Sequence, residues 1–164
     1  MQPRRIEFLQ GMPVFGAIRN DMLEVLLEHA RTVVVPAGEF FFRENDAADS
    51  MFVLEAGKVA VLKSWRNEEY QLHTLGRGDC FGEMALMDLF PRSAAVRAEE
   101  DCSAIEFTAA DLLHLFEHDI EQFALIQMNI GREVCRRLRA ADELLFRAKM
   151  GEEHSGSGTL FRSG

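Results

Sequence analysis

The segment that decides the fold is Phe81-Gly82-Glu83-Met84-Ala85-Leu86-Met87-Asp88-Leu89-Phe90-Pro91-Arg92-Ser93-Ala94-Ala95-Val96. Gly82 lets a ligand approach the backbone, and the short apolar helix expected after it directs unbonded N–H groups toward an anion. Arg92 adds a planar set of donors that matches phosphate oxygens, whereas an ionised Glu83 only accepts hydrogen bonds and suits a hydroxyl group. These residue types together favour a ligand with both a phosphate and a sugar hydroxyl.

This segment resembles the phosphate-binding cassette of cyclic nucleotide-binding domains, whose pattern is roughly Phe-Gly-Glu-(Leu/Ile)-Ala-Leu, a short variable loop and Pro-Arg-(Ser/Thr/Ala)-Ala. The resemblance extends to roughly residues 5–149, because the runs G-E-F-F, D-S-M-F-V-L-E-A-G-K-V-A-V and L-G-R-G-D-C-F-G-E follow in the family's order. It implies a reversible sensor of a cyclic nucleotide, with cyclic AMP expected first and cyclic GMP as the other candidate. We expect no catalytic residues and no cofactor, so the chain is not expected to be an enzyme.

The resemblance also implies roles for individual residues. Arg92 is expected to contact the cyclic phosphate, and Glu83 to accept a hydrogen bond from the ribose 2′-hydroxyl. Each also has a purely structural interpretation, since Arg92 could form a surface ion pair with Asp88 or a nearby Glu, and Glu83 could favour a helix N-terminus. The rest of the predicted ligand-binding set is Gly82, Met84, Ala85, Ser93 and Ala94; Gly82 and Ala85 would present N–H groups, and Ser93 is compatible with either nucleotide. Asn129, Arg132 and Arg136 are candidates for contact with the base. The alternative is that they lie on a solvated face of the helix.

The pattern along the chain predicts an α+β, mainly β fold. We expect an antiparallel, jelly-roll-like β-roll flanked by N-terminal helices and a long C-terminal helix, because short β-branched and aromatic runs with glycine turns lie between two helical stretches. Asn20 or Asp21 is expected to cap a helix, and Arg66 to Glu69 to form a hairpin tip. The predicted parts are a cyclic nucleotide-binding domain at 1–150, comprising helices at 1–30, the β-roll at 31–108 with its cassette at 81–96, and helices at 109–150; a flexible tail follows at 151–164.

An apolar stripe from Ile120 to Leu145 repeats at steps of three and four residues and predicts an amphipathic helix of some 25–30 residues. Such a helix exceeds what is needed to cover a small barrel. We therefore expect a homodimer through this helix, with packing inside one chain as the alternative. A rival interpretation of the whole chain is a β-roll interaction module that dimerises regardless of ligand.

Composition and charge narrow the function classes. The 164 residues suffice for one domain with a sizeable core, and the net charge of −9 argues against a nucleic-acid partner. The chain has no apolar run of about 18 residues, so we expect no membrane partner and a cytoplasmic location. The three cysteines, Cys80, Cys102 and Cys135, lack the spacing of a zinc site, and an odd number cannot pair fully within one chain. We therefore expect reduced thiols. Only His73 of the five histidines lies on an expected strand, which disfavours a cupin-like metal enzyme, and we expect no metal site.

Overall fold

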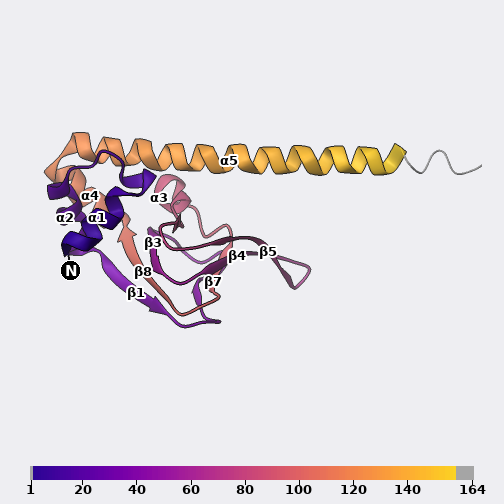
Figure 1. The fold of residues 1–164 in the computed structure, drawn as a ribbon, viewed down its shortest axis with the longest axis horizontal. Helices are drawn as coiled ribbons and strands as arrows, with labels where there is room; N and C mark the ends of the chain where they lie inside the picture. The colour runs from indigo at the N-terminus through magenta and orange to yellow at the C-terminus, as the bar shows by residue number, and fades with distance from the viewer. Residues whose placement is uncertain (1, 158–164) are drawn as a thin grey trace, which may run out of the picture. The chain divides into compact units, whose positions relative to one another are not determined.

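The computed structural model describes residues 2–157, and the chain divides into two compact units, residues 1–130 and 131–164. The first unit holds the described strands and every described helix except the later part of α5 (Figure 1). In chain order the elements are α1 (Gln2–Gln10), η1 (Pro13–Phe15), α2 (Asn20–His29), β1 (Arg31–Val35), β2 (Phe40–Phe42), β3 (Ser50–Ala56), β4 (Val59–Trp65), β5 (Glu68–Leu75), β6 (Cys80–Phe81), α3 (Met84–Asp88), β7 (Ala95–Ala98), β8 (Cys102–Thr108), α4 (Ala109–His118) and α5 (Ile120–Ser157).

The strands form two four-stranded antiparallel sheets, with the orders β1-β8-β3-β6 and β2-β7-β4-β5. Their inner faces share one apolar core. The first sheet contributes Val35, Phe52, Leu54, Phe81 and Ala104, and the second contributes Val59, Val61, Val96 and Ala98. The predicted α+β fold with an antiparallel β-roll is confirmed. The β-branched and aromatic runs form strands because they fit a half-buried pleated surface.

Strand β3 lies inside the first sheet, paired with both β8 and β6. Its first five residues are all buried, which means that both faces of this part of the sheet are covered. The inner face packs in the core between the sheets. On the outer side, the ring of Phe15 in η1 lies 5.6 Å from the ring of Phe107 in β8, so the N-terminal segment packs against the sheet. Strand β3 therefore fixes the position of β6, which leads directly into the segment at 81–96.

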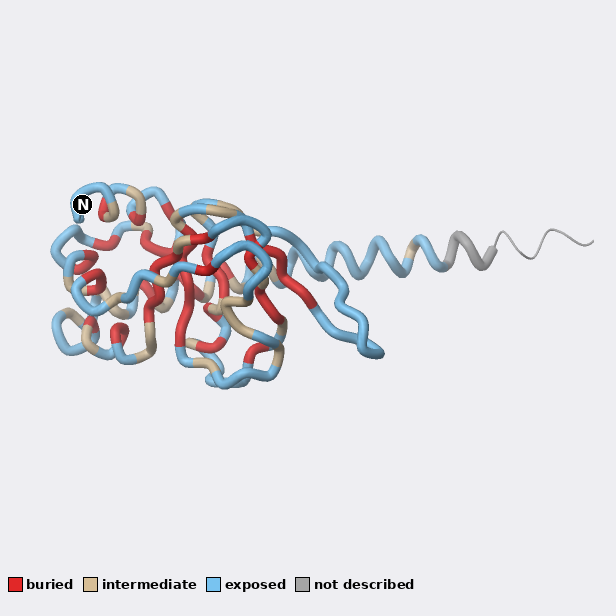
Figure 2. The backbone as a smooth tube through the Cα atoms, turned by 90° about the horizontal axis from the view of Figure 1, so that it is seen from below, coloured by how far each residue is buried: buried red, intermediate tan, exposed pale blue. Residues whose placement is uncertain are grey.

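The β4–β5 hairpin has a two-residue tip. Arg66 and Asn67 have φ angles of 51° and 65°, the left-handed pair that a tight hairpin turn with matching twist requires. The predicted four-residue tip was therefore too long, and β5 already begins at Glu68. Just before the tip, the exposed Trp65 ring lies 4.2 Å from the guanidinium carbon of Arg66 and 6.5 Å from the Tyr70 ring. Figure 2 shows this end of the hairpin as exposed, while the strands of the roll are buried at its centre.

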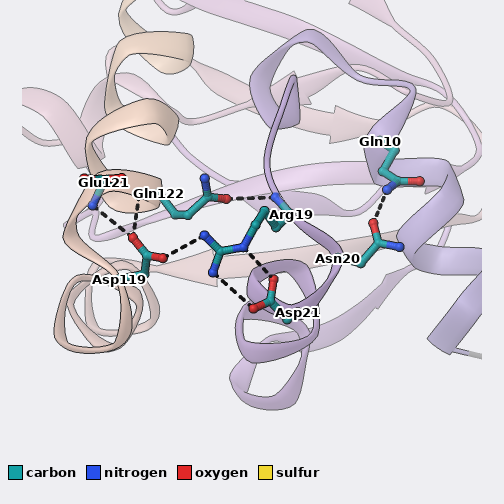
Figure 3. A network of polar contacts seen from close by, with 7 residues as sticks. All are labelled: Gln10, Arg19, Asn20, Asp21, Asp119, Glu121 and Gln122. Carbon is teal, nitrogen blue, oxygen red and sulfur yellow. Dashed lines mark hydrogen bonds and ion pairs between the residues drawn. The ribbon is translucent and has the colours of Figure 1, made fainter.

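The predicted cap of α2 was wrong. The residue before the helix is Arg19, and no side chain caps the helix there. The two predicted capping side chains are engaged elsewhere: Asn20 accepts a hydrogen bond from Gln10, and Asp21 accepts two from Arg19 at 3.1 Å each (Figure 3). Asp21 still lies in the first turn of α2, where its charge is favourable to the helix dipole.

Asp119 joins the corner between α4 and α5 to the N-terminal segment (Figure 3). Its Oδ1 accepts from the backbone N–H groups of Glu121 and Gln122, at 3.1 Å each, and its Oδ2 lies 2.9 Å from Arg19 Nη1. The backbone bond from Gln122 is the main cause that lowers the pKa of Asp119, and the ion pair with Arg19 adds to it. The backbone N–H of Arg19 in turn donates to Gln122 Oε1 at 2.8 Å. One carboxylate thus both starts α5 and holds the segment before α2.

Helix α5 is longer than predicted, with 38 residues against some 25–30. It continues through Gly131 and includes residues 151–157, the first seven positions of the predicted flexible tail. Residues 158–164 lie outside the described residues. The division of the chain at residue 150 stays a prediction. Among the described helices, none is both long enough and apolar enough to cross a membrane.

Candidate functional site

The segment at 81–96 folds into a strand end, a short helix and a loop. After β6, Gly82 has a φ angle of 80°, in the region that favours glycine, and the chain turns there into the five-residue helix α3. The helix ends where Leu89 adopts the left-handed conformation, with φ 58°, and its N–H bonds back to Ala85. The loop that follows returns the chain to β7 and brings Arg92 back toward Gly82.

Arg92 is only 6% exposed although it carries a charge. Its backbone N–H donates to the carbonyl of Asp46 at 2.9 Å, and its own carbonyl accepts from Asn45 at 2.8 Å. In the side chain, Nη1 donates to the carbonyl oxygen of Gly82 and Nη2 to the hydroxyl of Ser50, each at 3.1 Å. Backbone and side chain are therefore both fixed, and the guanidinium is held against the turn that begins α3.

The guanidinium of Arg92 also contacts an aromatic ring, with its Cζ 4.0 Å from the ring centroid of Phe42. Its Nε is buried and finds no acceptor among the residues that the structure describes. A buried donor without an acceptor is unfavourable, so an anion that reached Nε would remove a cost already present. The structural alternative, a surface ion pair with Asp88 or a nearby Glu, is not what the structure has, because Arg92 is buried and its guanidinium bonds go to Gly82 and Ser50.

Burial is the main influence on the pKa of Arg92 and lowers it. The carboxylates of Asp49, Glu106, Asp46 and Glu83 act in the opposite direction and raise the pKa. Because arginine is not deprotonated in proteins, Arg92 remains a buried cation, and the charges of these four carboxylates favour it. These carboxylates make the removal of the guanidinium from water tolerable.

Glu83 is 2% exposed and precedes α3 directly. It stands at the N-cap position, but its side chain does not cap the helix. Its position at the N-terminus of α3 is compatible with the structural interpretation, in which the carboxylate is favourable to the helix dipole, so the role of Glu83 in ligand binding stays a prediction. The two charged residues of the segment are both buried, and the charge of Glu83 acts on Arg92.

The other predicted ligand-binding residues differ in exposure. Met84 and Ser93 are exposed, Gly82 and Ala94 are intermediate, and Ala85 is buried. The N–H of Ala85 donates to the carbonyl of Gly82 at 3.3 Å, and the carbonyl of Ser93 accepts from Lys63 at 2.5 Å. For all five, contact with a ligand stays a prediction.

Asn129, a candidate for base contact, lies in the first part of α5 and is 5% exposed. Its Nδ2 donates to the carbonyl oxygens of Val14 at 3.1 Å and Gly16 at 2.9 Å. These bonds fasten α5 to the turn after η1. Contact of Asn129 with a base stays a prediction, and it would have to share or exchange these bonds.

Arg132 and Arg136, the other two candidates for base contact, belong to the second unit. The guanidinium of Arg136 pairs with the carboxylate of Glu133 on the same helix, with Nε at 3.2 Å from Oε2. Arg137 lies 3.3 Å from the same carboxylate, so Glu133 is shared by two arginines. For both candidates, contact with a base stays a prediction.

Three histidine rings gather where α2 and α4 end. The ring centroids of His29 and His114 are 4.3 Å apart, and those of His114 and His118 are 4.4 Å apart. His114 and His118 lie four residues apart on α4, whereas His29 is the last residue of α2 and distant in the chain. Within residues 2–157, no group of three metal-binding side chains is arranged to hold a metal ion. Of the three cysteines, Cys80 and Cys102 are buried and Cys135 is exposed.

Sequence reasoning did not find three of the residues around Arg92: Ser50, Phe42 and Glu106. The run containing Ser50 was interpreted only as a strand, and that containing Phe42 only as an aromatic run. Ser50 lies 42 positions before Arg92 and 56 before its other partner, Glu106, so no local spacing indicates these contacts. Only the pairing of β3 with β8 brings Ser50 and Glu106 together.

The family model for the cyclic nucleotide-binding domain matches residues 32–119, more than half of the chain. The match begins at the second residue of β1, ends just after α4 and includes the whole segment at 81–96. A cyclic AMP receptor protein from Thermus thermophilus is 30% identical over 135 residues, which cover 82% of this chain and 61% of that protein. A cAMP-dependent protein kinase regulatory subunit from Emericella nidulans is 32% identical over 94 residues, which cover 57% of this chain and 22% of that protein.

Among solved structures, the catabolite activator protein of Thermus thermophilus is similar, with a TM-score of 0.73 and 28% sequence identity. The match covers 84% of this chain and 63% of that chain. The chain therefore spans about three fifths of the bacterial regulator and about a fifth of the kinase regulatory subunit.

Proposed function

This chain belongs to the cyclic nucleotide-binding domain family, and from that premise we propose that it binds cyclic AMP reversibly at the segment 81–96. Arg92 is the contact for the cyclic phosphate, and Glu83 accepts a hydrogen bond from the ribose 2′-hydroxyl. Cyclic GMP is the second candidate, since Ser93 is compatible with either nucleotide. The protein does no chemistry on its ligand and has no cofactor.

The observation that carries this proposal is the burial and hydrogen bonding of the Arg92 guanidinium. It is a buried cation with two of its donors bonded to the protein and a third, Nε–H, without an acceptor among the described residues. A phosphate oxygen is a charged acceptor that matches the edge of a guanidinium and forms charge-assisted hydrogen bonds with it. Glu83 is also buried, and its charge acts on Arg92. Its carboxylate offers an acceptor for a hydroxyl group, a group that a simple inorganic anion such as phosphate does not need to present.

We propose that the output is a change in the C-terminal helix. A ligand that binds one conformation more tightly shifts the population toward it, and a helix that changes position can be read by a partner. The domain in this proposal comprises residues 1–150. Asn129, Arg132 and Arg136 remain the candidates that could link a bound base to α5.

A homodimer through α5 is part of the proposal. Leu138 and Leu145 are exposed and seven residues apart, with Ala141 between them, which is the spacing of a helix pair. The double variant Leu138→Glu/Leu145→Glu should sediment as a monomer if this face pairs. Arg139→Glu, which adds negative charge beside the stripe, is the control and should leave the dimer intact. A parent protein that sediments as a monomer would contradict the homodimer.

Calorimetric titration tests the ligand. The protein is unfolded and refolded to remove any carried-over nucleotide, then titrated with cyclic AMP and cyclic GMP separately. We expect saturable heat with cyclic AMP and a loss of roughly 100-fold in affinity for Arg92→Ala, because charge-assisted hydrogen bonds contribute about 1.5–3 kcal/mol each. Arg97→Ala, which removes an arginine paired with Glu69 and Glu99 near the protein surface, is the matched control and should bind as the parent does.

Two other outcomes would change the assignment. Heat from neither nucleotide would favour the interaction module that dimerises without a ligand. Stoichiometric metal in the purified protein would favour the cupin-like enzyme instead.

A further inference from the structure

Ser50, the first residue of β3, connects Arg92 to a second strand of the sheet. It is 3% exposed, and its hydroxyl lies 3.1 Å from Arg92 Nη2 and 2.9 Å from Glu106 Oε1. A guanidinium only donates and an ionised carboxylate only accepts, so the direction of both bonds is fixed. Ser50 accepts from Arg92 and donates its single proton to Glu106.

Glu106 is itself fixed on its far side. It is 8% exposed, and its Oε2 accepts from Nε of Arg31 at 3.1 Å and from Nη2 of the same guanidinium. Arg31 is largely exposed, with 72% of its side chain accessible. The result is a line of alternating donors and acceptors that runs from solvent through Arg31, Glu106 and Ser50 to Arg92.

This line determines where the remaining donors of Arg92 point. The guanidinium is planar, and three contacts define its plane: the carbonyl of Gly82, the hydroxyl of Ser50 and the ring of Phe42. Once Nη1, Nη2 and the ring face are fixed, the direction of Nε–H is fixed too. That group is the buried donor that has no acceptor among the described residues. Without Ser50, one of the two hydrogen-bond anchors is lost and the guanidinium can rotate away.

We propose that Ser50, held by Glu106, is a positioning residue that orients the Arg92 guanidinium for a phosphate group. The inference rests on the proposed function, because it concerns the same site. Ser50 does not itself contact the ligand. It keeps Arg92 in one orientation before the ligand arrives, so that less conformational entropy is lost on binding.

The test compares affinities for cyclic AMP, measured by calorimetry, across a set of variants with a folding check by chemical denaturation. Ser50→Ala should weaken binding about tenfold, the effect of one hydrogen bond to a charged group. Ser50→Thr keeps the hydroxyl and should restore most of the affinity. Arg31→Ala removes only the outer end of the line and should stay within about twofold of the parent.

A double-mutant cycle separates positioning from a general effect on the fold. In an Arg92→Lys background the ammonium keeps its charge but has no planar edge to orient, so adding Ser50→Ala should change the affinity by less than about twofold. An equal loss in both backgrounds would overturn the inference. If Ser50→Ala does not fold, Ser50→Cys serves the same purpose, since the thiol fills a similar space and is a much weaker hydrogen-bond acceptor for Arg92; affinity unchanged in this variant would also overturn the inference.

The failure of this inference differs from the failure of the proposed function. If the parent binds, Arg92→Ala does not, and Ser50→Ala binds as tightly as the parent, only the role of Ser50 is refuted. If the parent binds neither cyclic AMP nor cyclic GMP, the proposed function is refuted and the inference with it.

Discussion

The guanidinium of Arg92 occupies the space that a side chain on Gly82 would need. A Cβ atom built on Gly82 would lie 2.6 Å from Arg92 Nη1 and 3.2 Å from the carbonyl oxygen of Ser50. The glycine is therefore required for two reasons, its φ angle of 80° and the arginine packed against it. The two key positions of the segment, ten residues apart, depend on each other.

Gly82→Ala should lower the stability of the protein by more than the backbone strain at this position alone would. The left-handed conformation costs about 1–3 kcal/mol for a residue other than glycine, and the new methyl group must also displace Arg92. We expect a lower free energy of unfolding in urea and a loss of affinity for cyclic AMP. Gly78→Ala is the matched control, because Gly78 has a similar φ angle of 89° and no atom within 4 Å of its Cβ position. Equal effects of the two substitutions on affinity would contradict the proposed clash.

Asn129→Ala should lower the stability of the protein. The substitution removes the donor to two backbone carbonyls, of Val14 and Gly16, at a position that is nearly inaccessible to water. We expect a loss of roughly 1–3 kcal/mol in the free energy of unfolding, measured by denaturation in urea. Met128→Ala, at a neighbouring and largely exposed position of the same helix, is the control. A stability loss no larger than that of the control would show that these bonds contribute little.

Asp119→Ala should lower the thermal midpoint more than Asp119→Asn. Both variants remove the charge opposite Arg19, but asparagine keeps an acceptor for the N–H groups that begin α5. The comparison therefore separates the cap from the ion pair. Equal midpoints for the two variants would show that the cap contributes nothing measurable.

The contribution of Asp119 should also depend on pH. Its pKa is lowered in the folded protein from the usual 3.8, so its stabilising effect is fully present above pH 3.8. As the pH falls below 3.8 and through the lowered pKa, the unfolded state takes up the proton first and the effect is lost. The difference in stability between the parent and Asp119→Asn should be constant near neutral pH and shrink in that acidic range. A difference that grew on acidification would be incompatible with this sign.

The three thiols should react at different rates. Burial raises the pKa of Cys102, whose sulfur contacts the carbonyls of Lys58 and Glu100, and Cys80 is buried as well. Cys135 is exposed, so a thiol reagent at neutral pH should modify one cysteine quickly and two only after unfolding. Cys135→Ser should abolish the fast phase. A fast phase that persists in this variant would mean that a buried thiol is reached by solvent.

The fold could be predicted from the sequence because local signals and family order agreed. Apolar runs with glycine turns indicated the strands of the roll, and apolar steps of three and four indicated α5. The structure differs from the prediction where a partner outside the local run, or the continuation of a preceding helix, decides the local structure. Asn20 does not cap α2 because Gln10 engages its side chain, and residues 151–157 continue a helix despite their glycine and serine content.

The candidate site was predictable in part. Gly82, Glu83 and Arg92 stand in one short segment, so residue types and spacing are enough to predict that they form a common site; their contact with a ligand stays a prediction. Ser50 and Glu106 carry no such signal, because sheet pairing between β3 and β8 brings them together. A sequence pattern can indicate the residues that meet a ligand, but the residues that hold them in place emerge only from the fold.

The position of the tryptophan at the exposed end of the β4–β5 hairpin determines whether intrinsic fluorescence can report ligand binding. Trp65 is the single tryptophan of the chain, and it lies at this tip beside Arg66 and Tyr70. Its emission reports the water around the hairpin and is expected to change little when Arg92 meets an anion. A titration in which the fluorescence does not change would therefore not be evidence against binding. Phe42→Trp would place an indole against the Arg92 guanidinium, and together with Trp65→Phe it would convert intrinsic fluorescence into a reporter of the site.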